Sequence, residues 1–265
     1  MGNVYTILKG RIGNVMFQIA AAMSLAHRMK TNCKAYILPT YWTSKPDNCF
    51  LPTYLESYKN NVLNKIVFIE KLPPQYVLCQ ETEFSYNELP EIDNVCLSGY
   101  FQSEKYFNKP LVRDLFRMDK DMELYLNEKY HQLLLLHPVS VNVRRGDYLD
   151  LQDFHPVCSF SFFKEAMGIL GVDRHYLITS DDVSWCKQNF TMPNCHVVED
   201  LSPIENLYLQ SLCYDHIISN STYSWWGAWL DEKKDKRVIC PKKWFGPRLN
   251  HQNTKDLLPE DWIQI

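Results

Sequence analysis

The strongest constraint on the fold is an alternation of short apolar runs and helical segments in the second half of the chain. Short apolar runs are typical of strands buried in a parallel sheet, and the helices between them carry the chain back to the start of the next strand. The expected strands lie at residues 139–143, 175–179, 196–198, 216–219 and 237–240, and the expected helices at 160–170, 183–189, 203–214 and 225–230. This alternation predicts an α/β fold with a mainly parallel sheet.

The first half of the chain opens with the same plan but is less regular. Residues 4–8 are an expected strand, Gly10 to Asn14 an expected turn, and 16–29 an expected helix rich in Ala, Met and Leu. Possible strands follow at 66–69, 76–78 and 95–97, and residues 111–136 have helical composition. That helical segment is expected to end before Pro138, because proline disfavours helical geometry at the preceding residue. We therefore expect two domains, residues 1–137 and 138–265.

Charge and cysteine content argue against several classes of function. The 265 residues carry a formal net charge of −3 and no run of basic residues, so neither a nucleic-acid-binding surface nor a polybasic membrane contact is expected. Nine cysteines lie singly along the chain without a CxxC pair, which argues against a disulfide framework and against a zinc site. We expect reduced, mostly buried thiols, and a small or neutral ligand.

Membrane and export signals are not evident in the sequence. No apolar stretch approaches the roughly 18–20 residues that cross a bilayer, and the N-terminal segment lacks the layout of a signal peptide. These observations predict a cytoplasmic protein with no transmembrane segment. Nothing in the pattern indicates an oligomeric state.

Loops that follow strands are the candidate binding loops, because ligands of parallel α/β sheets bind beyond the carboxyl ends of the strands. The first such loop, Gly10-Arg11-Ile12-Gly13-Asn14, has two residues without a Cβ. Backbone amides and a helix N-terminus can there approach an anion or a sugar hydroxyl, which makes Gly10, Gly13 and Asn14 candidate donor-binding residues. A plain strand-to-helix turn explains this loop equally well.

The second candidate loop, Arg144-Arg145-Gly146-Asp147, follows the expected strand at 139–143. Adjacent arginines at a strand end point in different directions, so one can chelate a diphosphate while the other holds Asp147. Fixed guanidinium groups can stabilise a diphosphate leaving group, as a metal ion does in other transferases. Arg144, Arg145 and Asp147 are therefore the candidate catalytic residues. The alternative is a surface basic patch with a structural ion pair.

Two further loops carry polar side chains. Ser180-Asp181-Asp182 can contact a nucleotide base or ribose, bind a metal, or cap a helix. Ser219-Asn220-Ser221-Thr222-Tyr223-Ser224 places hydroxyl and amide groups between a strand and a helix, where they suit a phosphate and equally a helix N-cap. Three tryptophans follow at helical spacing, and we expect them in the core rather than stacked on a sugar; they are Trp225, Trp226 and Trp229.

Six segments, taken in order, resemble the motif series of the α-1,2-fucosyltransferase family, of the glycosyltransferase family 11 type. They are GRIGNVMFQIA, VSVNVRRGDYL, HPVCSFSFFKEAM, YLITSDDVSW, CYDHIISNSTYSWWGAWL and LLPEDWIQI. The resemblance extends from residue 10 to the end of the chain and is weakest between about residues 35 and 110.

The resemblance implies a GT-B-like fold of two Rossmann-like domains, with GDP-β-L-fucose as donor substrate and a glycan as acceptor. It implies an inverting reaction that forms an α-linked fucose, here an α-1,2 linkage to galactose or a similar residue, without a metal or another cofactor. Carried over, Arg144 and Arg145 correspond to the family's arginine motif, and Ser221, Thr222 and Tyr223 complete the donor pocket. Residues 138–265 are then the donor-binding domain, and 1–137 is the probable acceptor-side domain.

One departure from the family pattern bears on the mechanism. The family usually has His two residues before its first arginine, where this chain has Asn142. An amide can donate and accept hydrogen bonds, so Asn142 is a candidate donor-binding residue, but it cannot titrate near neutral pH and the general base stays unassigned. The available carboxylates are those of Asp147, Asp181, Glu199 and Asp200. Two other functions remain open: transfer of another GDP-hexose, such as mannose or rhamnose, and catalytically silent binding of a glycan or nucleotide.

Overall fold

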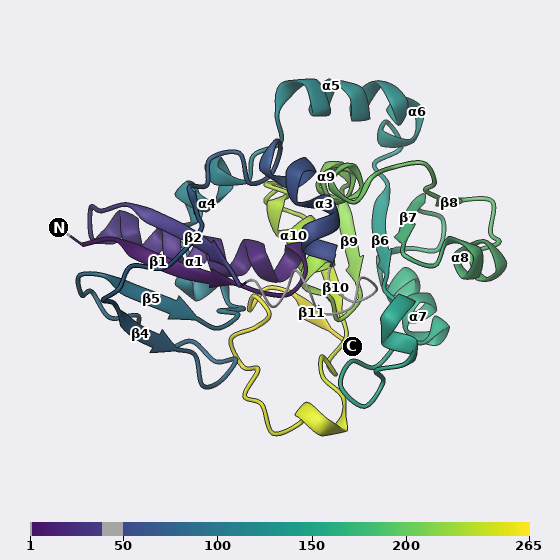
Figure 1. Ribbon diagram of the computed structural model, residues 1–265. Helices are drawn as coiled ribbons and strands as arrows, with labels where there is room; N and C mark the ends of the chain where they lie inside the picture. The colour runs from purple at the N-terminus through teal and green to yellow at the C-terminus, as the bar shows by residue number, and fades with distance from the viewer. Residues whose placement is uncertain (1, 39–49) are drawn as a thin grey trace. The chain divides into compact units, whose positions relative to one another are not determined.

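A computed structural model describes residues 2–38 and 50–265 of the chain (Figure 1). The chain divides into two compact units, each built on its own sheet. The first unit comprises Met1–Arg117 and Gln252–Pro259, and the second comprises Met118–His251 and Glu260–Ile265. Every strand pair described in both sheets is parallel, which confirms the predicted α/β class with mainly parallel sheets.

The sheet of the first unit has the strand order β3-β2-β1-β5-β4. Its strands are β1 Val4–Leu8, β2 Cys33–Ile37, β3 Phe68–Ile69, β4 Val77–Gln80 and β5 Val95–Ser98. Helix α1 (Ile12–Arg28) packs against β1 and β2 and buries a continuous series of Ala, Met, Leu and Phe side chains. Strand β1 has the predicted bounds, whereas α1 begins at Ile12 rather than at 16, so Gly13 and Asn14 lie in its first turn. Strand β2 was not predicted.

The sheet of the second unit has the strand order β11-β10-β9-β6-β7-β8. Its strands are β6 Val139–Val143, β7 Tyr176–Ser180, β8 Cys195–Val197, β9 Asp215–Ile218, β10 Val238–Cys240 and β11 Ile263–Gln264. Counted from β6 as the first strand, this is the doubly wound nucleotide-binding order 3-2-1-4-5-6. The order reverses between β6 and β9, and ligands of such sheets bind beyond the carboxyl ends of the strands at that reversal.

Helices fix the ends of these central strands. Strand β6 is buried along its whole length, and its valines pack against α7 (Phe160–Leu170) in one apolar cluster. Helix α9 (Pro203–Leu212) starts at the capping box formed by Ser202 and Glu205 and packs against β6 and α10 (Thr222–Leu230). The other α-helices of the described chain are α3 Phe50–Lys59, α4 Lys109–Leu115, α5 Lys120–Lys129, α6 His131–Leu134 and α8 Val183–Asn189.

Two helices extend the second unit beyond the predicted boundary at residue 137. The expected helix at 111–136 is three helices, α4, α5 and α6, and the division between the units falls before α5. Helix α5 packs against α9, and Lys129 at its end donates a hydrogen bond from Nζ to the carbonyl oxygen of Asp200 at 3.4 Å. These contacts group α5 and α6 with the second sheet.

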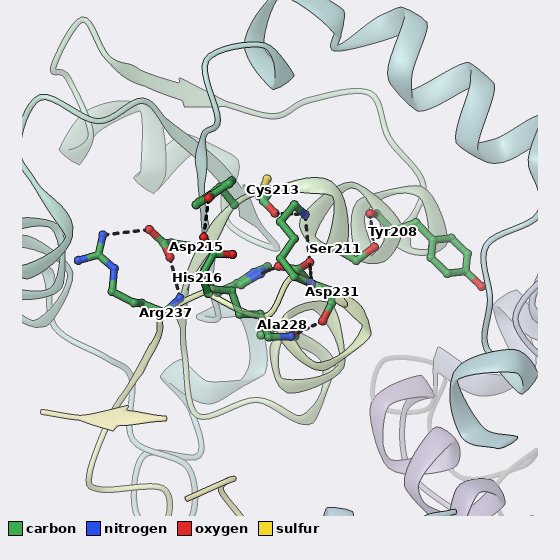
Figure 2. Close-up of polar contacts among 12 residues, drawn as sticks. Tyr208, Ser211, Cys213, Asp215, His216, Ala228, Asp231 and Arg237 are labelled. Atoms are coloured by element: carbon green, nitrogen blue, oxygen red, sulfur yellow. Dashed lines mark hydrogen bonds and ion pairs between the residues drawn. The ribbon is translucent and has the colours of Figure 1, made fainter. Parts of the chain in front are cut away.

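A buried polar cluster lies at the amino ends of the strands in the second unit (Figure 2). The carboxylate of Asp215 pairs with Arg174 at 2.9 Å and with Arg237 at 3.1 Å, and it also accepts the backbone N–H of Arg237. Beside it, Nε2 of His216 lies 3.0 Å from the carboxylate of Asp231. We call these five side chains, with Lys233, which pairs with Asp231 at 3.0 Å, the amino-edge cluster.

Other predicted features can be placed directly. Trp225, Trp226 and Trp229 are buried, as expected for core residues. Eight cysteines are free thiols, four of them buried and four half-buried, whereas Cys49 lies outside the described residues. Within the described part of the chain, no helix is both long enough and apolar enough to cross a bilayer. The cytoplasmic location stays a prediction.

Candidate functional site

The site in the second unit begins where the central strands β6 and β9 end. Arg144 and Arg145 directly follow β6, and Ser219 directly follows β9. The backbone N–H of Arg144 donates to Oγ of Ser219 at 3.0 Å, and this hydroxyl donates to the carbonyl oxygen of Asn142 at 2.7 Å. Ser219 therefore joins the two loops on either side of the point where the strand order reverses.

Asp181 fixes the turn that follows Arg144. One of its carboxylate oxygens accepts the backbone N–H of Arg145 at 2.9 Å, and the other pairs with Nη1 of Arg144 at 2.6 Å. A Cβ at Gly146 would lie 2.4 Å from that second oxygen, so only glycine leaves room for the carboxylate. Nη2 of Arg144 pairs with Asp147. Both Nη groups of Arg144 are thus held by carboxylates of the protein.

Arg145 is held differently. Its Nε donates to Asp182 at 3.0 Å, and its guanidinium carbon lies 4.2 Å from the centre of the Trp185 ring. Within residues 2–38 and 50–265, the two Nη groups of Arg145 make no hydrogen bond or ion pair. The guanidinium is therefore anchored at one edge and on one face, while its Nη fork keeps donors for a ligand.

Asp182 has two functions in this arrangement. Its Oδ1 accepts the backbone N–H of Trp185 at 3.1 Å and caps α8, as predicted for this turn. Its Oδ2 anchors Arg145. Burial alone would raise the pKa of Asp182, but the hydrogen bonds from Arg145 and from the Trp185 amide outweigh burial and lower that pKa. Asp182 is consequently an ionised partner of Arg145 at neutral pH.

The charges of this cluster do not by themselves attract an anion. Two guanidinium groups face three carboxylates, those of Asp147, Asp181 and Asp182. We call these five side chains the carboxyl-edge cluster. Affinity for a diphosphate at this position would come from directed N–H donors rather than from a net positive field.

The loop between β9 and α10 supplies such donors. Ser221 is the N-cap residue of α10, and its hydroxyl makes no hydrogen bond within the described residues. The first N–H groups of a helix have no partner inside the helix, so the start of α10 is suited to an anion. Because α10 begins at Thr222 rather than at 225, Thr222 and Tyr223 lie in its first turn and not in a loop.

Asn220, in this loop, and Tyr223, in the first turn of α10, have partners within the protein. The amide nitrogen of Asn220 donates to the carbonyl oxygens of Pro156 and Trp244, each at 2.9 Å, and Asn220 is almost fully buried. The hydroxyl of Tyr223 donates to the carbonyl oxygen of Pro203 at 2.5 Å, which ties α10 to the start of α9. Both side chains hold the loop in place.

Asn142 stands where the family usually has histidine, and its side chain bonds a residue of the neighbouring strand. It is buried, and its amide nitrogen donates to Oγ1 of Thr179 at 2.9 Å, between paired positions of β6 and β7. Ser180, at the end of β7, accepts the backbone N–H of Asp182 on its hydroxyl at 2.9 Å. Asn142 and Ser180 thus support the turns that carry the charged residues.

The glycine loop belongs to the first unit, where it follows β1. Gly10 has a φ of +84°, and a Cβ at this residue would lie 2.6 Å from the amide nitrogen of Asn14. Oδ1 of Asn14 accepts a hydrogen bond from Gln102 at 3.0 Å. The buried side chain of Gln18 bonds both the N–H and the carbonyl of Lys9 at 3.0 Å. Side chains of α1 thus fix this loop, with Gly13 buried in the helix.

The other carboxylates considered as a base lie outside these contacts. Glu199 pairs with Lys187 at 2.8 Å, with both side chains about half exposed. Asp200 is an exposed residue with a φ of +60°. Within the described part of the chain, no group of three or more His, Cys, Asp or Glu side chains is arranged to hold a metal ion.

Sequence reasoning missed three residues that build this site: Trp185 beside Arg145, Tyr148 and His155. It named Ser219 in the polar loop, but not as the link between the ends of β6 and β9. Arg144 lies over the Tyr148 ring, with 5.0 Å from its guanidinium carbon to the ring centre. The His155 ring stacks on the Tyr148 ring, with ring centres 4.9 Å apart at 18°. The segment HPVCSFSFF carried the signal for His155, because it is part of the motif series.

The profile of Glycosyl transferase family 11 matches residues 2–265. The chain belongs to this family. It is accordingly a glycosyltransferase, as the sequence predicted.

Two relatives of this family 11 glycosyltransferase align over nearly the whole of both chains. The O-antigen biosynthesis glycosyltransferase WbnK of Escherichia coli is 27% identical, over 99% of this chain and 100% of the relative. An α-1,2-colitosyltransferase of Escherichia coli is 26% identical, over 100% of this chain and 99% of the relative. The galactoside 2-α-L-fucosyltransferase SEC1 of Bos taurus is 26% identical, over 86% of this chain and 65% of the relative.

Solved structures place the fold of this family 11 chain among fucosyltransferases. The fucosyltransferase NodZ from Bradyrhizobium superposes with a TM-score of 0.54 at 12% identity, covering 86% of this chain and 91% of NodZ. POFUT1 in complex with GDP superposes with a TM-score of 0.54 at 10% identity, covering 89% of this chain and 97% of POFUT1. These likenesses confirm the predicted GT-B-like fold.

Proposed function

We propose that this family 11 glycosyltransferase transfers L-fucose from GDP-β-L-fucose to a sugar hydroxyl, with inversion, and forms an α-1,2 linkage to galactose or a similar residue. The second unit binds the donor, and the first unit binds the glycan acceptor. The observation that carries the proposal is the open Nη fork of Arg145 at the reversal of strand order between β6 and β9, in the same unit as the start of α10.

The chemistry requires stabilisation of a leaving group. The acceptor oxygen forms a bond to the anomeric carbon of the sugar, the bond from that carbon to the β-phosphate oxygen breaks, and GDP leaves with the electron pair. The acceptor proton passes to a base or to water. Because charge builds up on the diphosphate as the bond breaks, donors fixed in advance lower the barrier most. Arg145 and the N–H groups at the start of α10 supply such donors.

Arg144 has a supporting part in this scheme. Its two Nη groups are held by Asp147 and Asp181, so it fixes the turn from which Arg145 projects. This division matches the expectation that one arginine binds the diphosphate while the other holds Asp147. Ser180 to Asp182 and Ser221 to Tyr223 complete the proposed donor site, and the loop with Gly10, Gly13 and Asn14 belongs to the acceptor-side unit.

The substitution Arg145→Ala tests the proposal. We expect kcat/KM for GDP-fucose to fall by at least about 100-fold, as for loss of one fixed donor to a developing oxyanion. GDP is expected to raise the Tm of the wild type and to raise the Tm of this variant far less. Transfer is measured by mass spectrometry of the product, and the fold by far-UV circular dichroism.

Arg117→Ala is the matched control, because Arg117 is a strongly exposed residue just after the end of α4, and it pairs with the exposed Asp114 of that helix. This variant should transfer at the wild-type rate. If Arg145→Ala also keeps the wild-type rate while folded, the assignment of the diphosphate site is wrong.

A second donor is suggested by the relative that is an α-1,2-colitosyltransferase. Colitose and fucose are both deoxysugars, so a panel of GDP-linked fucose, colitose, mannose and rhamnose distinguishes the candidates by product mass. GDP binding without turnover on any donor and a broad acceptor array would instead indicate a silent binding protein.

We further propose that transfer needs neither a metal nor another cofactor, because hydrogen bonds from Arg145 and from the start of α10 stabilise the negative charge of the diphosphate. Activity in excess EDTA should equal activity without it. A loss that Mg²⁺ or Mn²⁺ restores would show that a metal takes part in the reaction.

A further inference from the structure

Arg144 rests on an aromatic ring as well as between two carboxylates. Its guanidinium carbon lies 5.0 Å from the centre of the Tyr148 ring. Tyr148 belongs to the short 3₁₀ helix Gly146–Leu149, and its hydroxyl donates to the carbonyl oxygen of Asn220 at 3.2 Å. The ring is thereby tied to the loop that precedes α10.

His155 supports this ring in turn. The His155 and Tyr148 rings stack 4.9 Å apart at 18°, and Phe245 lies 5.9 Å from His155. Three segments of the chain thus contribute to one row of side chains, Arg144, Tyr148, His155 and Phe245. We call Tyr148 and His155 the ring support.

Backbone contacts hold the segments that carry the ring support. The N–H of Gly246 donates to the carbonyl oxygen of Phe154 at 2.8 Å, beside His155. A Cβ at Gly246 would lie 2.3 Å from the carbonyl oxygen of Asp153, so the two segments approach as closely as glycine allows. Asn220 bonds Pro156 and Trp244 from the same loop that receives the Tyr148 hydroxyl. The row is therefore built by the fold and is not a chance surface contact.

The charge state of His155 suits a place beside a cation. Burial lowers the pKa of His155 below its ordinary value, and the Arg144 charge lowers it further, while Asp147 acts in the opposite direction. A neutral imidazole can stack on Tyr148 without repelling Arg144. Arg144 and Asp147 are the charged groups that act on this ring, with Tyr148 and Phe245 as its aromatic neighbours.

We propose that Tyr148 and His155 are positioning residues that hold Arg144, and through it the turn of Arg145, in the geometry that binds the donor diphosphate. This inference rests on the proposed function, because it concerns the same diphosphate site. The competing explanation is that the two rings only pack the loops together, in which case their effect on GDP binding is independent of Arg144.

Ring-deleting and ring-keeping substitutions separate these explanations. Tyr148→Leu and His155→Leu remove the support, and we expect each to raise the Kd for GDP by about fivefold to tenfold, the range of a partly desolvated cation–π contact. Tyr148→Phe and His155→Phe keep a ring and should stay within about twofold of the wild type. Calorimetry with GDP measures all four, and kinetics should show a raised donor KM with a smaller change in kcat.

His175→Leu is the matched control. His175 directly precedes β7, at the opposite ends of the strands from the carboxyl-edge cluster. Its ring lies 5.4 Å from the His196 ring at 16°, with Nδ1 of His175 3.1 Å from Nε2 of His196. This variant should bind GDP as the wild type does. If a Leu variant fails to fold, His155→Gln replaces His155→Leu and Tyr148→Gln replaces Tyr148→Leu, because each keeps a polar side chain without a ring.

A double variant gives the decisive readout. Because Tyr148 acts through Arg144, Tyr148→Leu should add no further loss of GDP affinity in the background of Arg144→Ala. Independent losses that multiply would overturn the inference, as would Leu variants with wild-type affinity or Phe variants as impaired as the Leu variants. If the wild type itself does not bind GDP, the proposed function and this inference both fail. If the wild type binds GDP and Arg145→Ala does not, only the ring variants decide this inference.

Discussion

The amino and carboxyl ends of the strands in the second sheet each carry a cluster of charged side chains. The two clusters differ in how many of their hydrogen-bonding groups have partners within the protein. In the amino-edge cluster, the Asp215 side chain is 2% exposed and serves two guanidinium groups and one backbone N–H. In the carboxyl-edge cluster, the Arg145 side chain is 16% exposed and keeps its Nη fork without a partner among the described residues. A cluster built around a buried carboxylate that is fully paired stabilises the fold, whereas a partly exposed cluster with unused donors is arranged for a ligand.

The pKa values of Asp215 and His216 show how charge is fixed in the amino-edge cluster. Burial would raise the pKa of Asp215, but hydrogen bonds from Arg237 and Arg174 outweigh it and lower that pKa. Burial lowers the pKa of His216 more than the neighbouring Asp231 raises it, so the ring is neutral at pH 7. Charge at the amino edge is therefore fixed by partners within the protein, and protonating or removing one partner should cost stability rather than activity.

The largest difference between the clusters is expected from Asp215→Asn. The substitution leaves the partly exposed guanidinium groups of Arg174 and Arg237 beside a buried amide with no counter-charge, and we expect it to lower the free energy of unfolding by about 2 kcal/mol. Urea unfolding measures this change as a shift in the midpoint. The GDP affinity of the folded variant should be unchanged. A loss below about 1 kcal/mol would show that the amino-edge cluster is not a stabilising feature.

The same substitution at the carboxyl edge, Asp182→Asn, should have the opposite balance. An Asn side chain still caps α8 through its oxygen, and the ion pair lost is partly exposed, so the free energy of unfolding should change by less than about 1 kcal/mol. Transfer should fall on the order of tenfold, because Arg145 loses the carboxylate that fixes its Nε. Equal effects of Asp182→Asn on stability and transfer would remove the distinction between the edges.

The smallest expected effect is in the pH dependence of stability. The folded-state pKa of His216 lies below its unfolded value, so this residue contributes stability that is present above about pH 6.5 and is lost as the pH falls towards the folded pKa. His155 and His196, whose pKa values burial also lowers, act in the same direction.

The replacement His216→Gln should make the free energy of unfolding fall less steeply as the pH is lowered. The slope should decrease by up to about 1.4 kcal/mol per pH unit, which is the limit for one proton. The measurement is the urea midpoint between pH 7.5 and pH 5 for the variant and the wild type. Parallel curves would mean that His216 takes up no proton on unfolding in this range.

Sequence and structure contributed different parts of the site. Local signals sufficed for the strand–loop–helix units, because apolar runs, the Ser202 capping box and the cap at Asp182 depend on neighbours within a few residues. They also sufficed to select the loops, since ligands of parallel sheets bind after the strands. The motif series indicated the family. Strand β2 was missed because its polar and apolar residues do not form a clear run.

What the sequence by itself determined is therefore an α/β chain whose arginines, acids and hydroxyls follow its strands. Only the tertiary structure decided which of these groups are paired within the protein. Arg145 meets Asp182 across 37 residues, and Arg144 meets Ser219 across 75. Such contacts depend on the order of strands in the sheet, which no local pattern encodes. In this order Asp215 is paired with two arginines, whereas the Nη groups of Arg145 have no partner among the described residues.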